Sequence, residues 1–308
     1  FTFPSVSEMI EPVPPDIIAA DSIEQVPISP ERVFLEVQGV MGAHGGTYTL
    51  LSFNGSVLKE EVSGSSDGPG ASGTQDVNGD GRLEVVLDDS NHYVFCYACG
   101  VAERVFRVFE WMPEQGEMSE RVLQPLLMGQ AQPLRDPVNR AVALAEAGLW
   151  KDALSPITEG RALLNQYPDA DVATVEWDYA LIQLHTTALI DELTNGAYPL
   201  LGAVFYGDYA RAVDLFRGYA PEQIFTPKSP LVAGTVAEGF ESDLVASLLE
   251  HTNNALAVQP DLADAYFLRG WAQYLADPAN PQARADILRA AELAPQDDLL
   301  SACADWLQ

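Results

Sequence analysis

The sequence predicts an α+β protein with two domains, a small all-β sheet or sandwich followed by an all-α array of helical repeats. Between residues 31 and 128, short runs of branched and aromatic residues alternate with turn signals, a pattern that is typical of strands. From residue 129 to residue 308 the chain is rich in alanine, and small and aromatic residues recur at fixed offsets, which indicates packed helix pairs. The length of 308 residues is enough for two hydrophobic cores.

The charge of the chain argues against several classes of partner. It has 45 acidic and 16 basic residues, for a formal net charge of −29, while 47% of its residues are hydrophobic, as in a globular protein. Phosphate groups are bound by clustered Lys and Arg, so we expect neither nucleic acid nor an anionic membrane surface as a partner. No apolar run reaches the roughly 18 residues of a membrane-spanning helix, so we expect no transmembrane segment. The acidity is typical of an extracellular or a halophilic protein.

Residues 1–30 form a proline-rich N-terminal segment, which we expect to be an arm or linker. Proline at this density disfavours a regular helix and favours extended backbone. The arm is expected to lie along a neighbouring domain or, alternatively, to insert into a second subunit. The chain begins with Phe1 and shows no signal peptide, which we interpret as a processed or trimmed start. The prolines are Pro4, Pro12, Pro14, Pro15, Pro27 and Pro30.

Six or seven short strands are expected in the domain of residues 31–128. Asn54 and Gly55 form the strongest short hairpin signal, and residues 42–46 form a second turn. Residues 63–70, rich in Ser and Gly, are expected to form a flexible loop. This number of strands suits a small sheet or sandwich and is too small for a complete propeller. The clearest expected strands are residues 33–37, 47–53, 56–58, 83–87, 93–97 and 104–111.

An acidic loop at residues 76–84 predicts a structural calcium site. Oxygen-bearing side chains stand at its first, third, fifth and ninth positions, and calcium takes six to eight oxygen ligands at ~2.3–2.6 Å. Gly79 and Gly81 allow the backbone to turn sharply around an ion. The alternative is an acidic hairpin turn without a metal. The expected ligands are the side chains of Asp76, Asn78, Asp80 and Glu84 and the backbone carbonyl of Arg82.

The sequence after the loop distinguishes it from an EF-hand. An EF-hand has a bidentate Glu at its twelfth position, where this chain has Leu87. An acidic loop that runs directly into a strand at residues 83–87 instead resembles the FG-GAP or VCBS repeats of integrin-like β-propellers and bacterial surface proteins. The resemblance covers about residues 74–111, in one copy, and implies a calcium loop inside a β-sheet unit.

Cys96 and Cys99 form a C-x-x-C pair near the end of an expected strand. They could form a local disulfide, which fits an exported protein. They could also be two reduced structural thiols, or a redox or zinc pair. The third cysteine, Cys303, is expected to be a buried small apolar residue.

The helical half contains an internal repeat. Its recurring positions are Gly148, Trp150, Ala153 and Ile157; Gly207, Tyr209, Ala212 and Phe216; and Tyr266, Gly270, Ala283, Ile287, Ala290 and Pro295. Small residues at fixed places let paired helices approach closely, and aromatic residues fill the space between them. The pattern resembles tetratricopeptide (TPR) repeats over about residues 136–308. The unit at residues 255–295 matches best, the insertion at residues 218–239 departs from the family, and residues 297–307 are expected to form a capping helix.

No catalytic constellation is found in the sequence. The four histidines, His44, His92, His185 and His251, belong to no metal or triad motif, and His185 is expected in the core or a groove. We therefore expect a non-enzymatic secreted or cell-surface scaffold that binds a protein partner, for example within a surface assembly or an oligomer. The alternatives are a glycan or cell-wall binding module and an unrecognised hydrolase.

Overall fold

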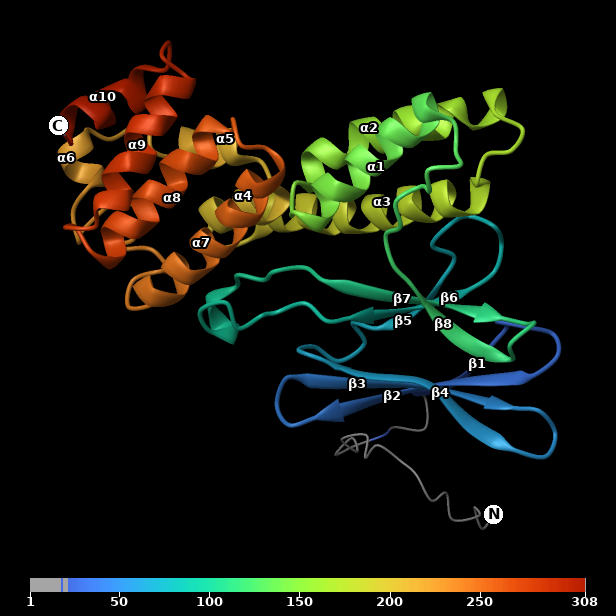
Figure 1. Ribbon diagram of the computed structural model, residues 1–308. Coiled ribbons are helices and arrows are strands. Elements are labelled where there is room, and N and C mark those ends of the chain that lie inside the picture. Colours follow the sequence, from blue (N-terminus) through green and yellow to red (C-terminus); the bar gives the residue numbers. More distant parts are fainter. Residues whose placement is uncertain (1–17, 19–21, 308) are drawn as a thin grey trace. The chain divides into compact units, whose positions relative to one another are not determined.

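The structure, a computed structural model, describes residue 18 and residues 22–307, and it divides into two compact units (Figure 1). The first unit contains the chain up to Ser90 together with Val105–Val122, and the second contains Asn91–Arg104 and Leu123–Gln308. Two antiparallel sheets are followed by a helical region, so the α+β layout expected from the sequence is confirmed. In the described part of the chain, no helix combines the length and hydrophobicity needed to cross a membrane.

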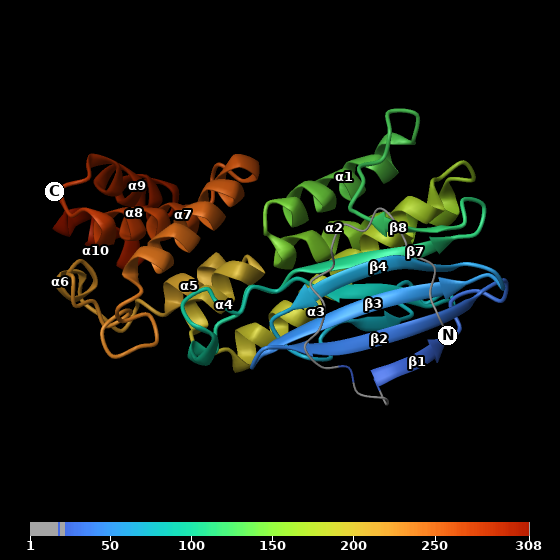
Figure 2. The same ribbon diagram turned by 90° about the horizontal axis from the view of Figure 1, so that it is seen from below.

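The first unit is built from two four-stranded antiparallel sheets, each in the strand order of the sequence. Figure 2 shows the strands of the first sheet side by side. The first sheet consists of β1 (Ile23–Val26), β2 (Val33–Met41), β3 (Gly45–Phe53) and β4 (Leu58–Ser66). The second consists of β5 (Gly73–Gln75), β6 (Glu84–Asp88), β7 (Phe106–Met112) and β8 (Glu117–Arg121).

The two sheets enclose one hydrophobic core, to which both contribute buried side chains. In β3, Tyr48, Leu50 and Ser52 are buried while the residues between them are partly exposed, the period of two expected for strands with one buried face. Phe34 from the first sheet meets Trp111 from the second edge to face, with ring centroids 5.0 Å apart. Such aromatic pairs add packing energy beyond the area that they bury.

Some local expectations for this region are wrong. The strand expected at residues 93–97 is absent; a turn and a short 3₁₀ helix at Tyr97–Cys99 take its place, and they belong to the helical unit. The loop expected at residues 63–70 is partly strand, because β4 extends to Ser66. Strand β1 lies in the segment expected as an arm, and the rest of that arm, residues 1–17 and 19–21, lies outside the described residues.

The second unit is helical, and its helices share one large core. Near the C-terminal end, a helix forms where the capping helix was expected. The helices are α1 (Gln132–Glu146), α2 (Trp150–Leu163), α3 (Val172–Asn195), α4 (Pro199–Tyr206), α5 (Tyr209–Asp214), α6 (Pro221–Ile224), α7 (Glu241–Val258), α8 (Ala263–Ala276), α9 (Pro281–Leu293) and α10 (Asp298–Trp306), with a 3₁₀ turn at Leu164–Gln166.

The sequence repeat corresponds to a repeated helical turn. Gly148 follows α1 and Gly207 follows α4, with φ of +76° and +80°, a conformation that favours glycine. In both turns the residue after the glycine donates its N–H to the carbonyl five residues earlier, at 2.8 Å. A Cβ on Gly270 of α8 would lie 2.8 Å from the carbonyl oxygen of Ala283 in α9, so this small residue permits close helix packing. The finer resemblance to tetratricopeptide repeats stays a prediction.

The first prediction concerns the glycine of the second turn. A Cβ on Gly207 would lie 2.7 Å from the Cα of Leu149 and 2.8 Å from the carbonyl oxygen of Gly148. Gly207→Ala should therefore lower the free energy of unfolding by about 2–4 kcal/mol, from backbone strain and overlap together. Gly234 has φ +78° but open space around its Cβ position, so Gly234→Ala should lose only about 1 kcal/mol. Equal losses in denaturant unfolding of the two variants would contradict the close contact.

Candidate functional site

The acidic loop connects β5 to β6 in the first unit. Gln75 and Glu84 pair directly across the two strands, so the loop between them closes a hairpin. Gly79 and Gly81 have φ of +76° and +86°, and nothing lies within 4 Å of a Cβ at either position. The sequence-based expectation that these glycines turn the backbone is confirmed.

The side chains of the loop turn inward and hold its backbone. The two carboxylate oxygens of Asp76 accept N–H groups from residues 79–81, at 2.7–3.1 Å. Asn78 accepts the N–H of Asp80 at 2.9 Å, and Asp80 accepts that of Arg82 at 2.8 Å. Hydrogen bonds of this kind, called Asx turns, fix the backbone of a loop that has no regular secondary structure. The alternating residues that the sequence predicts as ligands therefore share one side-chain direction, toward the loop interior.

Glu84 is the most constrained residue of the predicted set. Its side chain is fully buried; Oε2 accepts the N–H of Val77 at 2.8 Å, and Oε1 has no hydrogen-bond partner. Burial, together with the neighbouring charges of Asp80, Glu110 and Asp76, raises the pKa of Glu84 to about 7, against the opposing effect of the hydrogen bond from Val77. A carboxylate in this position needs either a proton or a cation.

The chemistry of this donor set fits calcium, although the ligands are not gathered. Three carboxylates, an amide oxygen and a backbone carbonyl are hard oxygen donors of the kind that Ca²⁺ takes. Among the residues that the structure describes, no three His, Cys, Asp or Glu side chains lie close enough together to hold a metal ion. Binding would therefore require Asp76, Asp80 and Glu84 to close around the ion. The calcium site stays a prediction, supported by the unpartnered oxygen of Glu84.

Cys96 and Cys99 are joined by a disulfide, with their Cα atoms 5.1 Å apart. Of the alternatives that the sequence leaves open, this is the one that the structure contains. The third cysteine, Cys303, is fully buried in the helical core as expected, and burial raises the pKa of its thiol to about 12.

The loop Asn91–Arg104 of the helical unit contains the disulfide, and antiparallel backbone pairing of Asn91 with Glu103 closes it. The ring of Phe95 packs against Tyr198 and Phe240, with centroid distances of 5.7 Å to each. The buried carboxylate of Glu192 on α3 accepts the N–H of Ala102 and pairs with a neighbouring arginine, both at 3.3 Å. The backbone pairing fixes the two ends of the loop, the disulfide constrains its middle, and these contacts hold it against the helices.

Three aromatic residues on this loop, His92, Tyr93 and Tyr97, form what we term the aromatic cluster. The rings of Tyr93 and His92 lie 5.6 and 6.1 Å from that of Tyr97, and Tyr93 is 54% exposed. The sequence did not indicate this cluster, because the same aromatic residues predicted a strand. Their nearness to the C-x-x-C pair was the signal that could have indicated a closed loop.

His185 is a structural residue, as expected. Its ring stacks on Trp150 with centroids 4.4 Å apart, and Nδ1 lies 3.0 Å from the carbonyl oxygen of Leu181. Burial lowers the pKa of this imidazole, so it is neutral near pH 7. These contacts account for the side chain without a catalytic role.

Comparisons of the chain with protein-family models, curated proteins and solved structures give no match. The resemblances to FG-GAP or VCBS repeats and to tetratricopeptide repeats therefore rest on the sequence motifs alone.

Calcium should raise the thermal stability of the protein. With dissociation constants of ~10⁻⁴–10⁻³ M, as in extracellular modules, millimolar calcium would stabilise the folded state by about 0.4–1.5 kcal/mol. Melting in calcium and in chelator measures the difference. Asp80→Ala should abolish it, whereas Glu114→Ala, in the exposed turn between β7 and β8, should keep it. Identical melting of the wild type in both buffers would argue against the site.

The disulfide should be present in protein taken from its native source. Intact mass and peptide mapping after alkylation without reductant should find Cys96 and Cys99 unmodified, because their sulfurs are bonded to each other. Cys303 serves as the internal control, since its buried thiol should be alkylated only after denaturation. Two alkylated thiols in the Cys96–Cys99 peptide would instead indicate a reducing compartment.

Proposed function

We propose that this chain is a non-enzymatic protein of the cell exterior that binds a protein partner through the aromatic cluster, with the acidic loop as a structural calcium site. The observation that carries the proposal is an exposed Tyr93 on a loop held by a disulfide and by Phe95. Tyrosine is enriched at the energetic centres of protein interfaces. Because the loop is already fixed, little conformational freedom is lost when a partner docks.

Two features support a location outside the cytoplasm. Disulfides persist in oxidising compartments and are rare in cytosolic proteins. Calcium sites of the expected affinity are filled where the ion is millimolar, which is the case outside cells. The disulfide joins Cys96 and Cys99, and the ligands expected for calcium lie in the acidic loop.

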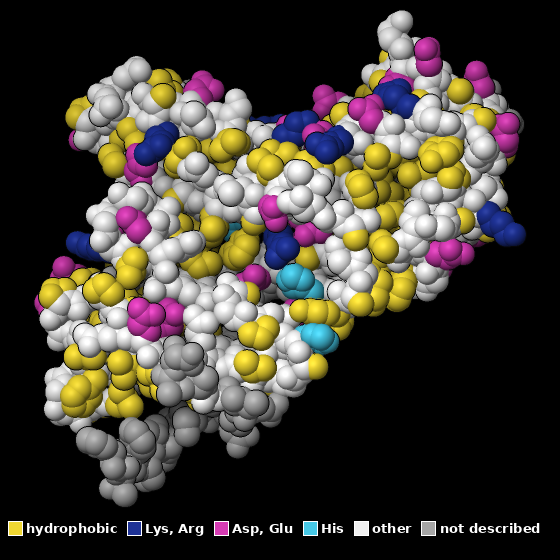
Figure 3. Space-filling model, turned by 180° about the vertical axis from the view of Figure 1, so that it is seen from behind, with side chains coloured by type: hydrophobic (Ala, Val, Ile, Leu, Met, Phe, Trp, Pro, Cys, Tyr) yellow, Lys and Arg dark blue, Asp and Glu magenta, His cyan; other side chains and the backbone are white. Residues whose placement is uncertain are grey.

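The charge of the chain supports a basic or neutral partner. The formal net charge is −29, and Figure 3 shows Asp and Glu side chains spread over one face of the molecule rather than gathered in one patch. Spread charge of one sign attracts a basic partner from a distance and repels an acidic one. Exposed charges are screened beyond ~8–10 Å at physiological salt, so this contribution falls as salt rises.

A photo-crosslinking amino acid at position 93 of the full chain tests the proposal. We expect a discrete adduct with one protein of the native cell envelope, weaker at high salt and lost in Tyr97→Ala, which removes the ring that supports Tyr93. The matched control is the same crosslinker at position 219, where a tyrosine of the helical unit is also exposed. A crosslink to a second copy would identify an oligomer. Equal labelling from both positions, or none from position 93, would show that the aromatic cluster is not the docking surface.

A further inference from the structure

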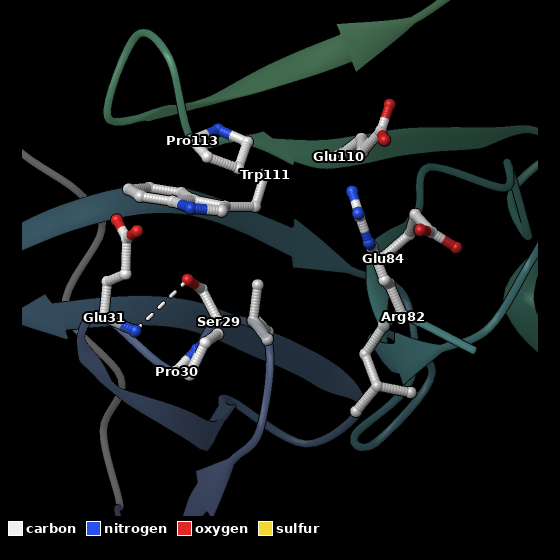
Figure 4. A pocket seen from close by; sticks show the side chains of 10 residues that line it. Ser29, Pro30, Glu31, Arg82, Glu84, Glu110, Trp111 and Pro113 are labelled. Atoms are coloured by element: carbon white, nitrogen blue, oxygen red, sulfur yellow. Dashed lines mark hydrogen bonds between the residues drawn. The ribbon is translucent and has the colours of Figure 1, made fainter. Parts of the chain in front are cut away.

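A pocket of about 230 Å³ opens in the first unit, next to the acidic loop (Figure 4). It is formed by three segments that are distant in sequence: the turn after β1, the start of β6 and the end of β7. Its lining residues are Ile28, Ser29, Pro30, Glu31, Arg82, Leu83, Glu84, Glu110, Trp111 and Pro113. Half of them are apolar and half are polar, as in many small-molecule sites.

Among the described residues, several polar groups at this pocket have no partner. Nε1 of Trp111 is buried and makes no hydrogen bond, although the N–H of a buried tryptophan usually finds an acceptor. In the part of the chain that the structure describes, the side chains of Arg82 and Glu31 form neither an ion pair nor a hydrogen bond. Figure 4 shows Glu31 and Arg82 toward opposite ends of the Trp111 ring, and the indole nitrogen on the edge turned toward Ser29.

The other two carboxylates of the pocket do not face the Trp111 ring as free acceptors. Glu110 is paired with Arg121. Glu84 accepts the N–H of Val77, and Figure 4 shows its carboxylate directed away from Trp111. The groups beside the Trp111 ring that lack a partner are therefore two donors, Arg82 and the indole N–H, and one acceptor, Glu31; the unpartnered Oε1 of Glu84 belongs to a carboxylate directed away from the ring. The charges of Arg82 and Glu31 balance.

We propose that this pocket binds a neutral, hydroxyl-rich ring of the size of one sugar unit. Hydroxyl groups both donate and accept, so one ring can accept from Arg82 and from the indole N–H while it donates to Glu31. The C–H faces of such a ring would rest on the apolar wall that includes Pro30 and Pro113. An anionic ligand would be repelled by Glu31 and Glu84, and a cationic ligand would be repelled by Arg82.

The size of the pocket supports the same assignment. Its volume is below the ~300–1,000 Å³ of pockets for drug-sized ligands, so it suits one ring and not a dinucleotide or a folded peptide. Core packing explains the position of the Trp111 ring, because Phe34 packs against this ring and Arg32 lies over one of its faces. Core packing does not account for the unpartnered indole N–H or for the free Arg82. The proposal stands whether or not the loop binds calcium.

The test is an NMR titration of the full chain with the methyl glycosides of glucose, galactose and N-acetylglucosamine, in calcium and in chelator. Trp111→Phe identifies the indole N–H resonance of Trp111. We expect a saturable shift of that resonance with at least one sugar, with a dissociation constant on the order of 1 mM for so small a ligand. Glycine, which is zwitterionic, is the comparison ligand.

The variants decide whether the pocket is responsible. Arg82→Gln keeps the backbone carbonyl of the loop and Glu31→Gln keeps the side-chain shape; each should weaken binding about tenfold, since each removes a hydrogen bond to a charged group. Arg107→Gln is the control, because Arg107 pairs with Glu120 and is not among the lining residues. No saturable shift with any sugar, a shift with glycine alone, or unchanged binding in both pocket variants would overturn the proposal.

Discussion

The burial of the Glu84 carboxylate is the constraint on which the site region of the first unit depends. Its strand position opposite Gln75 places it at the base of the acidic loop, and its Oε2 holds the backbone of Val77. The other oxygen is buried without a partner, so the folded state is disfavoured when Glu84 carries an uncompensated charge. A proton or a cation relieves this cost, and the same residues, Arg82 and Glu84, line the neighbouring pocket. The ionisation of one side chain therefore bears on both candidate sites.

A second buried carboxylate, that of Glu192, has a structural role, and its charge is compensated by partners in the protein. It receives the N–H of Ala102 and pairs with Arg104, so its charge is compensated by neighbours within the helical unit. Glu192 thereby holds the loop Asn91–Arg104, which contains the disulfide, in place. The contrast with Glu84, which has one oxygen without a hydrogen-bond partner and three acidic neighbours, supports the proposal that a cation completes the acidic loop.

The sequence predicted those features that depend on local chemistry. Gly79 and Gly81 take the positive φ expected of them, and Gly148 and Gly207 end helices in the same conformation because the repeat places them there. The strand expected at residues 93–97 is wrong because aromatic residues also suit burial against helices: Phe95 packs on Tyr198 and Phe240, while Tyr93 of the same run is exposed. The pocket could not be predicted, since Glu31, Arg82 and Trp111 meet only after three distant segments fold together.

The most direct test of this account is a calorimetric calcium titration of the full chain at pH 6 and pH 8, in buffers of different ionisation enthalpy. Because burial raises the pKa of Glu84 to about 7, its carboxyl group is mostly protonated at pH 6 and mostly ionised at pH 8. The account predicts one calcium per chain, release of about one proton at pH 6 and almost none at pH 8, and loss of both signals in Glu84→Gln. No binding heat at either pH, or binding with unchanged proton release in Glu84→Gln, would contradict it.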